Sequence, residues 1–397
     1  MKILVVCQMY KPEQFLINEI APELVRRGHS VTVLTGLPNY PEGFVLKEYR
    51  FFKNRNEVTE GVKIKRCFEI GRRNSKVFLI LNYLSYAISA SIKILFIRER
   101  FDVVFSYQLS PVTMVYPAII YKLIKHVKIL LYCLDIWPES AQAHVNSDEG
   151  KLYKIISKLS KSIYNKCDKI AVTSEPFIEY LEGINGVSRG KMCYIPQHAD
   201  PKLLDFDLVA EDNGVADFMF AGNIGYGQNL ETIIKAVGQL REKDGFIVHI
   251  VGDGSRTLFL KELARQEGVE DKIIFHGRFS NSEMLKFYKM ADALLITLRG
   301  NNFVGMTMPG KLQTYMTTGK PIFGAINGAA NKIITEADCG ACVNSGDYQG
   351  LAVLLRDYID NPQKYDKCGR NAKEYFKKNF IKEIYINSLE NELLKLV

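Results

Sequence analysis

Near the start of the chain, segments with the apolar pattern of a buried strand alternate with a segment that has the apolar pattern of a helix. Lys2–Cys7 is an almost unbroken apolar run, which predicts a strand covered on both faces. In Phe15–Arg27 the apolar residues lie on one helical face; Gly28 is suited to end this helix, and Pro22 predicts a kink or a late start. Ser30–Leu34 is again a predicted strand. The three segments predict a βαβ unit with parallel strands.

The alternation of strands and helices continues through the first half of the chain. Further strands are predicted at Val62–Arg66, Phe101–Ser106, Lys128–Cys133, Asp168–Thr173 and Lys191–Ile195. This order predicts one doubly wound α/β domain, which we place at residues 1–200.

The pattern stops at His198–Asp217, an acidic stretch without periodicity, and then starts again. Strands are predicted at Phe218–Phe220, Gly245–Val251, Lys272–Phe275 and Ala293–Leu298, with helices between them. A second α/β domain is therefore expected over residues 201–380. Residues 381–397 are predicted to form a helix that crosses back to the first domain.

One segment, Lys76–Arg100, is long, apolar and aromatic, with basic residues on both sides. A membrane-spanning helix needs about 20 mostly apolar residues, and here the run is interrupted by Asn82, Ser85, Ser89, Ser91 and Lys93. We therefore favour a buried helix of the first domain over a transmembrane helix. A helix that lies on an anionic membrane surface is the other open interpretation, because its flanks are basic.

The stretch from residue 305 to 324 predicts a loop, a short helix and a strand. Pro309 fits the first helical turn, where its missing N–H has no partner in any case. Gly319 fits the position just past the helix end. The apolar face of this helix is formed by Leu312, Tyr315 and Met316.

Lys311 stands in the first turn of this helix, where the helix dipole favours anions. A lysine beside free backbone N–H groups makes a phosphate site; a solvated surface lysine is the alternative. Glycine-rich turns follow neighbouring strands at Ala221–Gln228 and at Gly252-Asp-Gly254. Because the carboxyl ends of parallel strands meet at one edge of a sheet, these turns are expected to converge around Lys311, which favours the phosphate interpretation.

The only tryptophan lies in Leu134–Ser140, directly after a predicted strand. Ligands of open α/β sheets bind beyond such strand ends, so Asp135 and Glu139 are expected to touch a ligand and Trp137 to form an apolar wall. The same residues also fit a helix N-terminus with Pro138 at its first position.

Composition narrows the possible functions. The net charge of +8 fits an anionic small molecule or an anionic membrane surface, and the basic residues form no stripe with aromatics, which argues against nucleic acid. Eight scattered cysteines include a single CxxC, Cys339 to Cys342, so no metal or redox site is expected. Such cysteine usage is typical of a reducing, cytosolic compartment. The opening apolar run is too short for a signal peptide.

These motifs, in this order, resemble glycosyltransferase family 4, the retaining GT-B enzymes, and especially bacterial O-antigen and capsule transferases of the N-acetylfucosamine type. The matching pieces are Lys2–Gln8, Arg27–Pro41, Asp135–Ser140, Phe220–Gly225, Val251–Gly254 and Pro309–Tyr315. The resemblance implies two Rossmann-like domains facing a cleft, with a nucleotide-sugar held mainly by the second. It implies no metal ion and no other cofactor.

The resemblance also implies roles for individual residues. Among the catalytic residues Asp135, Glu139 and Lys311, Lys311 would stabilise the leaving diphosphate and Asp135 would orient the acceptor or the sugar. The implied donor site comprises Gly222, Asn223 and Gly225 at the diphosphate, Gly252, Asp253 and Gly254 near the nucleotide, Arg278 by the base, and Arg299, Pro309, Gly310, Lys311, Gln313 and Thr314.

The chain departs from the family pattern at several positions. Many members carry glutamates where this chain has Met306 and Thr314, so the ribose contacts would pass to Gln313 or Thr314. An arginine and a lysine common near the first glycine of the second domain are absent, and Asn223 and Gln228 stand nearby instead.

The implied reaction is a retaining, metal-independent transfer of a hexose or N-acetylhexosamine from a UDP-sugar, in O-antigen or capsule synthesis. The expected partners are a polyprenyl-diphosphate-linked saccharide acceptor and an anionic membrane surface, so the protein is expected in the cytoplasm, peripheral at the inner face of the cell membrane. Two alternatives stay open: a UDP-sugar 2-epimerase on the same architecture, and a non-catalytic nucleotide-sugar-binding subunit, which the missing glutamates motivate.

Overall fold

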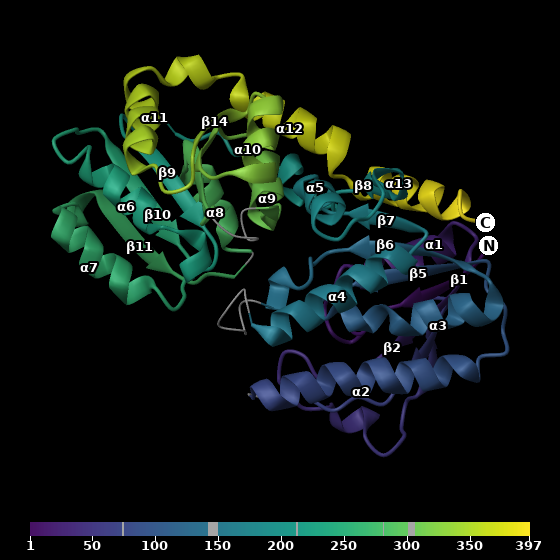
Figure 1. Cartoon of the computed structure of the whole chain (residues 1–397). Helices are drawn as coiled ribbons and strands as arrows, with labels where there is room; N and C mark the ends of the chain where they lie inside the picture. The colour runs from purple at the N-terminus through teal and green to yellow at the C-terminus, as the bar shows by residue number, and fades with distance from the viewer. Residues whose placement is uncertain (74, 142–149, 212, 281, 301–305) are drawn as a thin grey trace. The chain divides into compact units, whose positions relative to one another are not determined.

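The computed structural model describes residues 1–73, 75–141, 150–211, 213–280, 282–300 and 306–397 (Figure 1). The chain forms two compact units, each built around one sheet. The first unit comprises Met1–Ile195 and Ile386–Val397, and the second comprises Pro196–Tyr385. The division falls slightly before the predicted boundary at residue 200.

The first unit contains an eight-stranded sheet with the order β3-β4-β2-β1-β5-β6-β7-β8. Its strands are β1 (Lys2–Val6), β2 (Ser30–Thr35), β3 (Asn56–Thr59), β4 (Val62–Arg66), β5 (Val103–Gln108), β6 (Lys128–Cys133), β7 (Lys169–Val172) and β8 (Met192–Tyr194). Neighbouring strands pair in parallel, except that β3 pairs antiparallel with β4. The apolar pattern did not predict β3, whose residues are mostly exposed.

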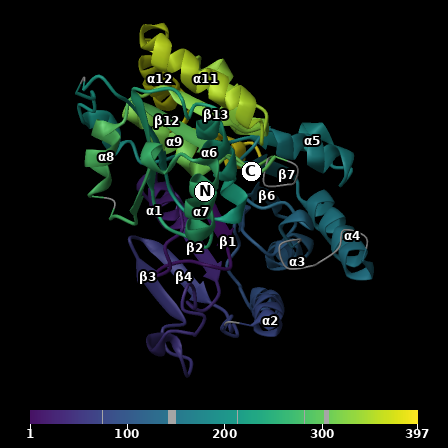
Figure 2. The same ribbon diagram turned by 90° about the vertical axis from the view of Figure 1, so that its left-hand side faces the viewer.

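The helices of this unit are α1 (Ile17–Arg26), α2 (Lys76–Leu95), α3 (Tyr116–Lys125), α4 (Lys151–Lys166) and α5 (Pro176–Gly183). Figure 2 shows α2, α3 and α4 next to one another beside the sheet. Pro22 lies inside α1. Because β1, β2, β4, β5 and β6 are parallel, their C-terminal ends lie along one edge of the sheet.

Helix α2 buries only one side. Its buried residues are Asn82, Tyr86, Ala87, Ala90 and Ile94, and Tyr86 Oη lies within hydrogen-bonding distance of the carbonyl oxygens of Cys7 (3.0 Å) and Leu34 (3.3 Å). Its other side exposes Val77, Ile80, Leu81, Leu84, Ile88, Ile92 and Leu95. By length and composition α2 could cross a membrane, but its polar contacts with the sheet make it an integral helix of the first unit. The predicted buried helix is thus buried on one side.

The second unit contains a six-stranded parallel sheet with the order β11-β10-β9-β12-β13-β14. Its strands are β9 (Ala216–Ala221), β10 (Phe246–Val251), β11 (Ile273–Gly277), β12 (Ala293–Thr297), β13 (Ile322–Ala325) and β14 (Gly340–Val343). Its helices are α6 (Glu231–Gly238), α7 (Thr257–Glu267), α8 (Met284–Met290), α9 (Gly310–Thr318), α10 (Gly328–Glu336), α11 (Tyr348–Asp360) and α12 (Cys368–Asn379).

Helices cover both faces of this second sheet (Figure 1). Phe218 and Phe220 of β9 pack into a core with α6, α7 and α11, whereas Met219 and Ala221 pack into a core with α8, α9, α10 and α12. Successive residues of a strand point to opposite faces, so an unbroken apolar strand supplies both cores. The predicted doubly wound arrangement is therefore confirmed for this unit.

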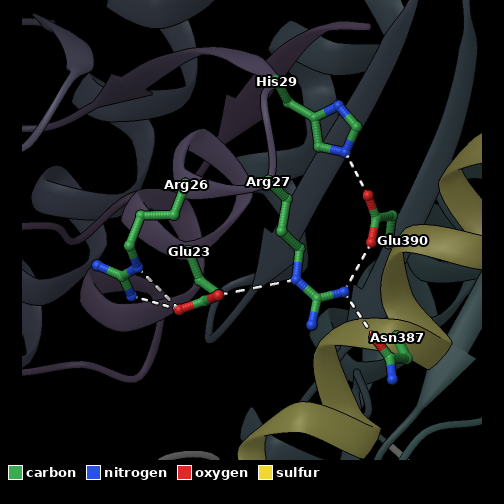
Figure 3. A network of polar contacts seen from close by, with 6 residues as sticks. All are labelled: Glu23, Arg26, Arg27, His29, Asn387 and Glu390. Carbon is green, nitrogen blue, oxygen red and sulfur yellow. Dashed lines mark hydrogen bonds and ion pairs between the residues drawn. The ribbon is translucent and has the colours of Figure 1, made fainter.

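The last helix, α13 (Lys382–Leu394), passes from the second unit into the first. Glu390 accepts hydrogen bonds from Arg27 Nη1 at 2.7 Å and from His29 Nε2 at 2.6 Å (Figure 3). Arg27 Nη1 also donates to Asn387 Oδ1 at 2.6 Å. The apolar side of this end of α13 is buried through Ile386, Leu389 and Leu393. The C-terminal residues therefore complete the first unit.

Candidate active site

The central strand of the second sheet, β9, ends at the glycine-rich loop. Tyr315 of α9 holds this end, because Tyr315 Oη accepts a hydrogen bond from Ala221 N at 2.7 Å and donates to Ala221 O at 3.2 Å. The ring is fully buried, and burial raises the pKa of Tyr315. The loop after β9 and the start of α9 are therefore fixed to each other.

Two glycine turns approach each other closely at this edge. A Cβ atom on Gly252 would lie 1.9 Å from the carbonyl oxygen of Gly222, and one on Gly254 would lie 2.4 Å from that of Ile224. Gly222 and Gly252 also have positive φ values, +138° and +145°. Only glycine fits both the conformation and the space, which explains why glycines recur at the ends of β9 and β10.

Lys311 is the second residue of α9, and its ammonium lies over the loop after β9. Nζ would lie 3.3 Å from a Cβ atom on Gly222, and it lies 3.7 Å from the centroid of the Phe220 ring. Nζ donates a hydrogen bond to Gln228 Oε1. Within the described part of the chain, Lys311 has no ion-pair partner.

The charge of Lys311 is therefore poorly compensated. Burial lowers its pKa to about 7, because an ammonium removed from water is disfavoured unless an anion stands beside it. The first backbone N–H groups of α9 add positive potential at the same place. The arrangement can accept a phosphate group, and that phosphate would favour the charged form of Lys311 again.

A cavity of about 380 Å³ opens beside these turns. The predicted residues that line it are Gly222, Asn223, Gly252, Asp253 and Arg278. Its apolar wall is formed by Phe279, Met284 and Tyr288, which were not predicted. The apolar spacing in α8 was the only signal in the sequence for Met284 and Tyr288, and Phe279 lies in the loop before this helix.

Asp253 and Asn223 shape the two turns. Asp253 is exposed, and its Oδ1 accepts hydrogen bonds from Gly254 N at 2.7 Å and Thr257 Oγ1 at 3.0 Å. These bonds lower the pKa of Asp253. A Cβ atom on Gly225 would lie 2.7 Å from Asn223 Nδ2, so Gly225 leaves room for the Asn223 amide.

Arg299 and Gln313 have internal partners. Arg299 forms an ion pair with Glu231 at 3.0 Å and stacks on Tyr226, with 3.7 Å between the guanidinium carbon and the ring centroid. It lines a separate cavity of about 530 Å³. Gln313 is buried and donates to the backbone carbonyl of Gln197. Neither residue lines the cavity beside Gly222.

The start of α9 differs slightly from the prediction. Pro309 is the N-cap residue, with φ −71° and ψ 126°, so the helix begins at Gly310. Gly310 is exposed, and a Cβ atom there would meet nothing within 4 Å. Thr314 is half-buried, and its carbonyl accepts a hydrogen bond from Thr317 Oγ1 at 2.6 Å. Residue 305, where the predicted loop begins, lies outside the described residues.

Asp135 follows β6 in the first unit. Its Oδ2 accepts hydrogen bonds from Ser110 N at 2.9 Å and Ser110 Oγ at 2.8 Å. Trp137 Nε1 donates to Ser110 Oγ at 3.0 Å. Burial raises the pKa of Asp135, whereas the two bonds from Ser110 lower it. Ser110 therefore orients a carboxylate at the sheet edge where a ligand is expected.

Glu139 is held by two phenols. Its Oε1 accepts hydrogen bonds from Tyr153 Oη at 2.7 Å and from Tyr180 Oη. Glu139–Ala141 form a short 3-10 turn, and α4 begins at Lys151. Residues 142–149, where the helix after Pro138 was predicted, lie outside the described residues. In the described structure, Glu139 links α4 and α5 through its hydrogen bonds with Tyr153 and Tyr180.

A buried polar network at the same edge was not predicted. The carboxylate of Glu69 accepts hydrogen bonds from Gln8 Nε2 at 2.8 Å, Asn82 Nδ2 at 2.6 Å and Leu37 N at 3.2 Å. It thereby joins the end of β1, the loop after β2 and α2. Burial raises the pKa of Glu69 to about 8, although the hydrogen bonds from Gln8 and Asn82 lower it.

Two family models match the chain. The model described as Glycosyltransferase Family 4 matches residues 15–203, and the one described as Glycosyl transferases group 1 matches residues 205–375. Together they cover nearly the whole chain. The chain therefore belongs to glycosyltransferase family 4 and is a glycosyltransferase of the GT-B fold.

Three known proteins are similar to this chain over at least nine-tenths of their length. The Escherichia coli (strain K12) protein WcaI, provisionally named a colanic acid biosynthesis glycosyl transferase, is 24% identical over 99% of this chain and 100% of its own. Glycogen synthase of Mycobacterium tuberculosis (strain H37Rv) is 21% identical over 96% of this chain and 91% of its own. The structure of Anabaena Alr3699/HepE in complex with UDP matches with a TM-score of 0.71 at 15% identity, over 100% of both chains.

Proposed function

We propose that the chain is a retaining, metal-independent transferase that moves a hexose or N-acetylhexosamine from a UDP-sugar to a polyprenyl-diphosphate-linked saccharide. The diphosphate of the donor binds at Gly222, Lys311 and the N-terminus of α9. The observation that carries the proposal is the Lys311 ammonium, which is partly buried beside a glycine backbone and has no ion pair among the described residues.

Two of the similar proteins support UDP as the nucleotide and polysaccharide synthesis as the pathway. The HepE structure, which shares the fold, was determined with UDP. The name of WcaI refers to colanic acid biosynthesis. We therefore propose UDP as the nucleotide and a surface polysaccharide, such as O-antigen or capsule, as the product.

The proposed mechanism needs no metal, because the protein itself supplies positive charge where the diphosphate leaves. Preorganised N–H groups and a cation stabilise developing negative charge strongly in a site that excludes water. In a retaining transfer the acceptor hydroxyl attacks from the face that the diphosphate leaves, and a departing phosphate oxygen takes its proton. Lys311 and the start of α9 stabilise that phosphate.

We further propose that the protein works in the cytoplasm, bound peripherally to the inner face of the cell membrane. The exposed apolar side of α2 begins near Arg73 and Lys76 and is followed by Arg98 and Arg100. Helix α3 packs beside α2 and exposes Leu123 and Ile124. An apolar helix side with basic flanks binds anionic membrane interfaces.

A transfer assay tests the proposal. Purified protein is incubated with a panel of UDP-sugars and undecaprenyl-diphosphate-N-acetylglucosamine, with and without EDTA, and the product is examined by NMR for the configuration of the donor anomeric carbon. We expect retention, no effect of EDTA, and a loss of about a hundredfold in turnover for Lys311→Ala.

Lys364→Ala is the matched control, because Lys364 also lies over an aromatic ring, Tyr365, but is exposed. Turnover that survives Lys311→Ala nearly unchanged would remove Lys311 from the site. An inverted product would contradict the retaining mechanism.

A further inference from the structure

Arg72, in the loop after β4, is held firmly at the C-terminal edge of the first sheet. A Cβ atom on Gly71 would lie 2.6 Å from the carbonyl oxygen of Gly43, and Arg73 N donates to that same oxygen at 2.8 Å. Arg72 N donates to Asn39 Oδ1 at 3.3 Å. The loops after β2 and β4 are therefore interlocked, and Arg72 has a fixed backbone position.

The side chain of Arg72 lies between two tyrosine rings. Its guanidinium carbon is 5.5 Å from the ring centroid of Tyr40 and 5.6 Å from that of Tyr83. Nη2 contacts Met9 Sδ at 3.7 Å, and Nε is buried without a hydrogen-bond partner in the described part of the chain. A guanidinium has five N–H donors. Most of the donor capacity of Arg72 is thus unused by the described residues.

The charge of Arg72 acts on two buried carboxylates, Glu13 and Glu69, but forms an ion pair with neither. Burial raises the pKa of Glu13 and of Glu69, and the charge of Arg72 lowers both. Glu13 Oε1 is occupied by the backbone N–H groups of Asn39 at 2.8 Å and Tyr40 at 2.7 Å. No described carboxylate stands within ion-pair distance of the guanidinium, so an external anion can take that place.

Tyr83 connects Arg72 to Asp135. The rings of Tyr83 and Trp137 meet edge to face with centroids 6.4 Å apart. Trp137 Nε1 donates to Ser110 Oγ, which donates to Asp135 Oδ2. Burial raises the pKa of Tyr83. The charge of Asp135 raises this pKa further, whereas the charge of Arg72 lowers it. Arg72 and Asp135 therefore border one aromatic wall.

We propose that Arg72 binds a phosphate or diphosphate group of the acceptor, beside Asp135. This inference rests on the proposed function, because it names the part of the acceptor that the first unit recognises. A guanidinium fork matches two phosphate oxygens, and stacking between aromatic rings keeps it oriented. A lipid-linked diphosphate and a soluble sugar phosphate present the same chemistry to Arg72.

Intrinsic fluorescence tests this directly, because Trp137 is the only tryptophan of the chain. The intact protein is saturated with UDP, which fills the donor site, and is then titrated with farnesyl diphosphate, inorganic pyrophosphate or farnesol. We expect both phosphate probes to change the Trp137 emission. Arg72→Met is expected to weaken their binding by about tenfold or more, and Arg72→Lys by less. Farnesol binding is expected to show no dependence on Arg72.

Arg26→Met is the matched control, because Arg26 is an exposed arginine that pairs with Glu23 on α1. Tighter binding of farnesyl diphosphate than of pyrophosphate would assign the phosphate to a lipid-linked acceptor, and equal binding would assign it to a soluble one. Equal affinities in wild type and Arg72→Met, or no response to either phosphate probe while UDP binds, would overturn the proposal. Failure of UDP itself to bind would contradict the proposed function instead. Circular dichroism checks the fold of each variant, and Arg72→Lys carries the test if Arg72→Met misfolds.

Discussion

The proposed donor site is formed by single residues of the second unit, and burial sets the pKa of its lysine, Lys311. The pKa of Lys311 is about 7 in the folded protein and 10.5 in the absence of structure. A lowered lysine pKa means that its contribution to stability is present at high pH and is lost as the pH falls through 7. A phosphate beside Nζ would reverse this effect. The same burial that disfavours the charge in the free protein therefore strengthens its attraction for an anion.

Gly252→Ala tests the close approach of the two glycine turns. The added Cβ would collide with the carbonyl oxygen of Gly222, and a φ of +145° is unfavourable for any residue with a side chain. We expect a loss of about 2–4 kcal/mol in the free energy of unfolding, together with loss of UDP binding. Urea denaturation and a UDP titration measure the two effects.

Gly227→Ala is the control for this variant, since a Cβ on Gly227 meets nothing within 4 Å. It is expected to change stability by no more than about 0.5–1 kcal/mol. Wild-type UDP affinity in Gly252→Ala would show that the turns do not form the donor site.

Secondary-structure elements were predictable where the pattern is local. β1, β6 and β10 were predicted within a residue of their observed bounds, because a strand covered on both faces must be apolar throughout. β3 was missed, because it is a short, exposed edge strand whose pairing with β4 depends on contacts in space. Helix α2 showed the limit of hydropathy, which could not tell its buried side from its exposed one.

Among the residues of the candidate site, those in local motifs were predictable, and those whose surroundings come from distant segments were not. Gly222, Gly252 and Lys311 were predicted as phosphate-binding residues because a glycine turn and a helix N-terminus are local features. Glu69 and Arg72 were not, since their surroundings come from strands and loops far apart in the sequence. Their burial becomes visible only when the sheet is assembled.

The Glu69 network predicts a dependence of stability on pH. The pKa of Glu69 is raised from 4.5 to about 8, so its contribution is fully present below 4.5 and is lost as the pH rises through 8. We expect the melting temperature of wild type to fall between about pH 4.5 and pH 8 relative to Glu69→Gln, which cannot titrate. Calorimetry of both proteins across this range gives the difference, and a difference that stays constant with pH would contradict a protonated Glu69.

The exposed side of α2 predicts membrane binding. Ile88 is 59% exposed and lies in the middle of the apolar row, so Ile88→Asp is expected to leave the fold intact. Burial of one isoleucine in a membrane interface corresponds to about tenfold in affinity, and we expect at least this loss in co-sedimentation with phosphatidylglycerol vesicles. Val353→Asp, at an exposed position of α11 in the second unit, is the control. Vesicle binding equal to wild type in Ile88→Asp would rule out α2 as the membrane surface.

At the scale of the whole molecule, the two ends of the chain stabilise the same unit. Burial raises the pKa of Glu390, but the hydrogen bonds from Arg27 and His29 overcome this effect and lower it. Glu390→Ala is therefore expected to destabilise the first unit by about 1–3 kcal/mol. Asn391→Ala changes an exposed neighbour and is expected to be neutral. Thermal unfolding compares the two variants, and equal stabilities would mean that α13 is not needed by the first unit.

All the residues proposed to bind the donor diphosphate belong to the second unit, so UDP binding measures that site without any acceptor. The most direct test is titration calorimetry of UDP into the intact protein at about pH 8, in two buffers of different ionisation enthalpy, with and without EDTA. We expect binding that takes up protons, is unchanged by EDTA, and in Lys311→Met is weakened about tenfold or more with the uptake abolished. Binding without proton uptake, binding that EDTA abolishes, or equal binding in Lys311→Met would contradict a metal-free donor site built around Lys311.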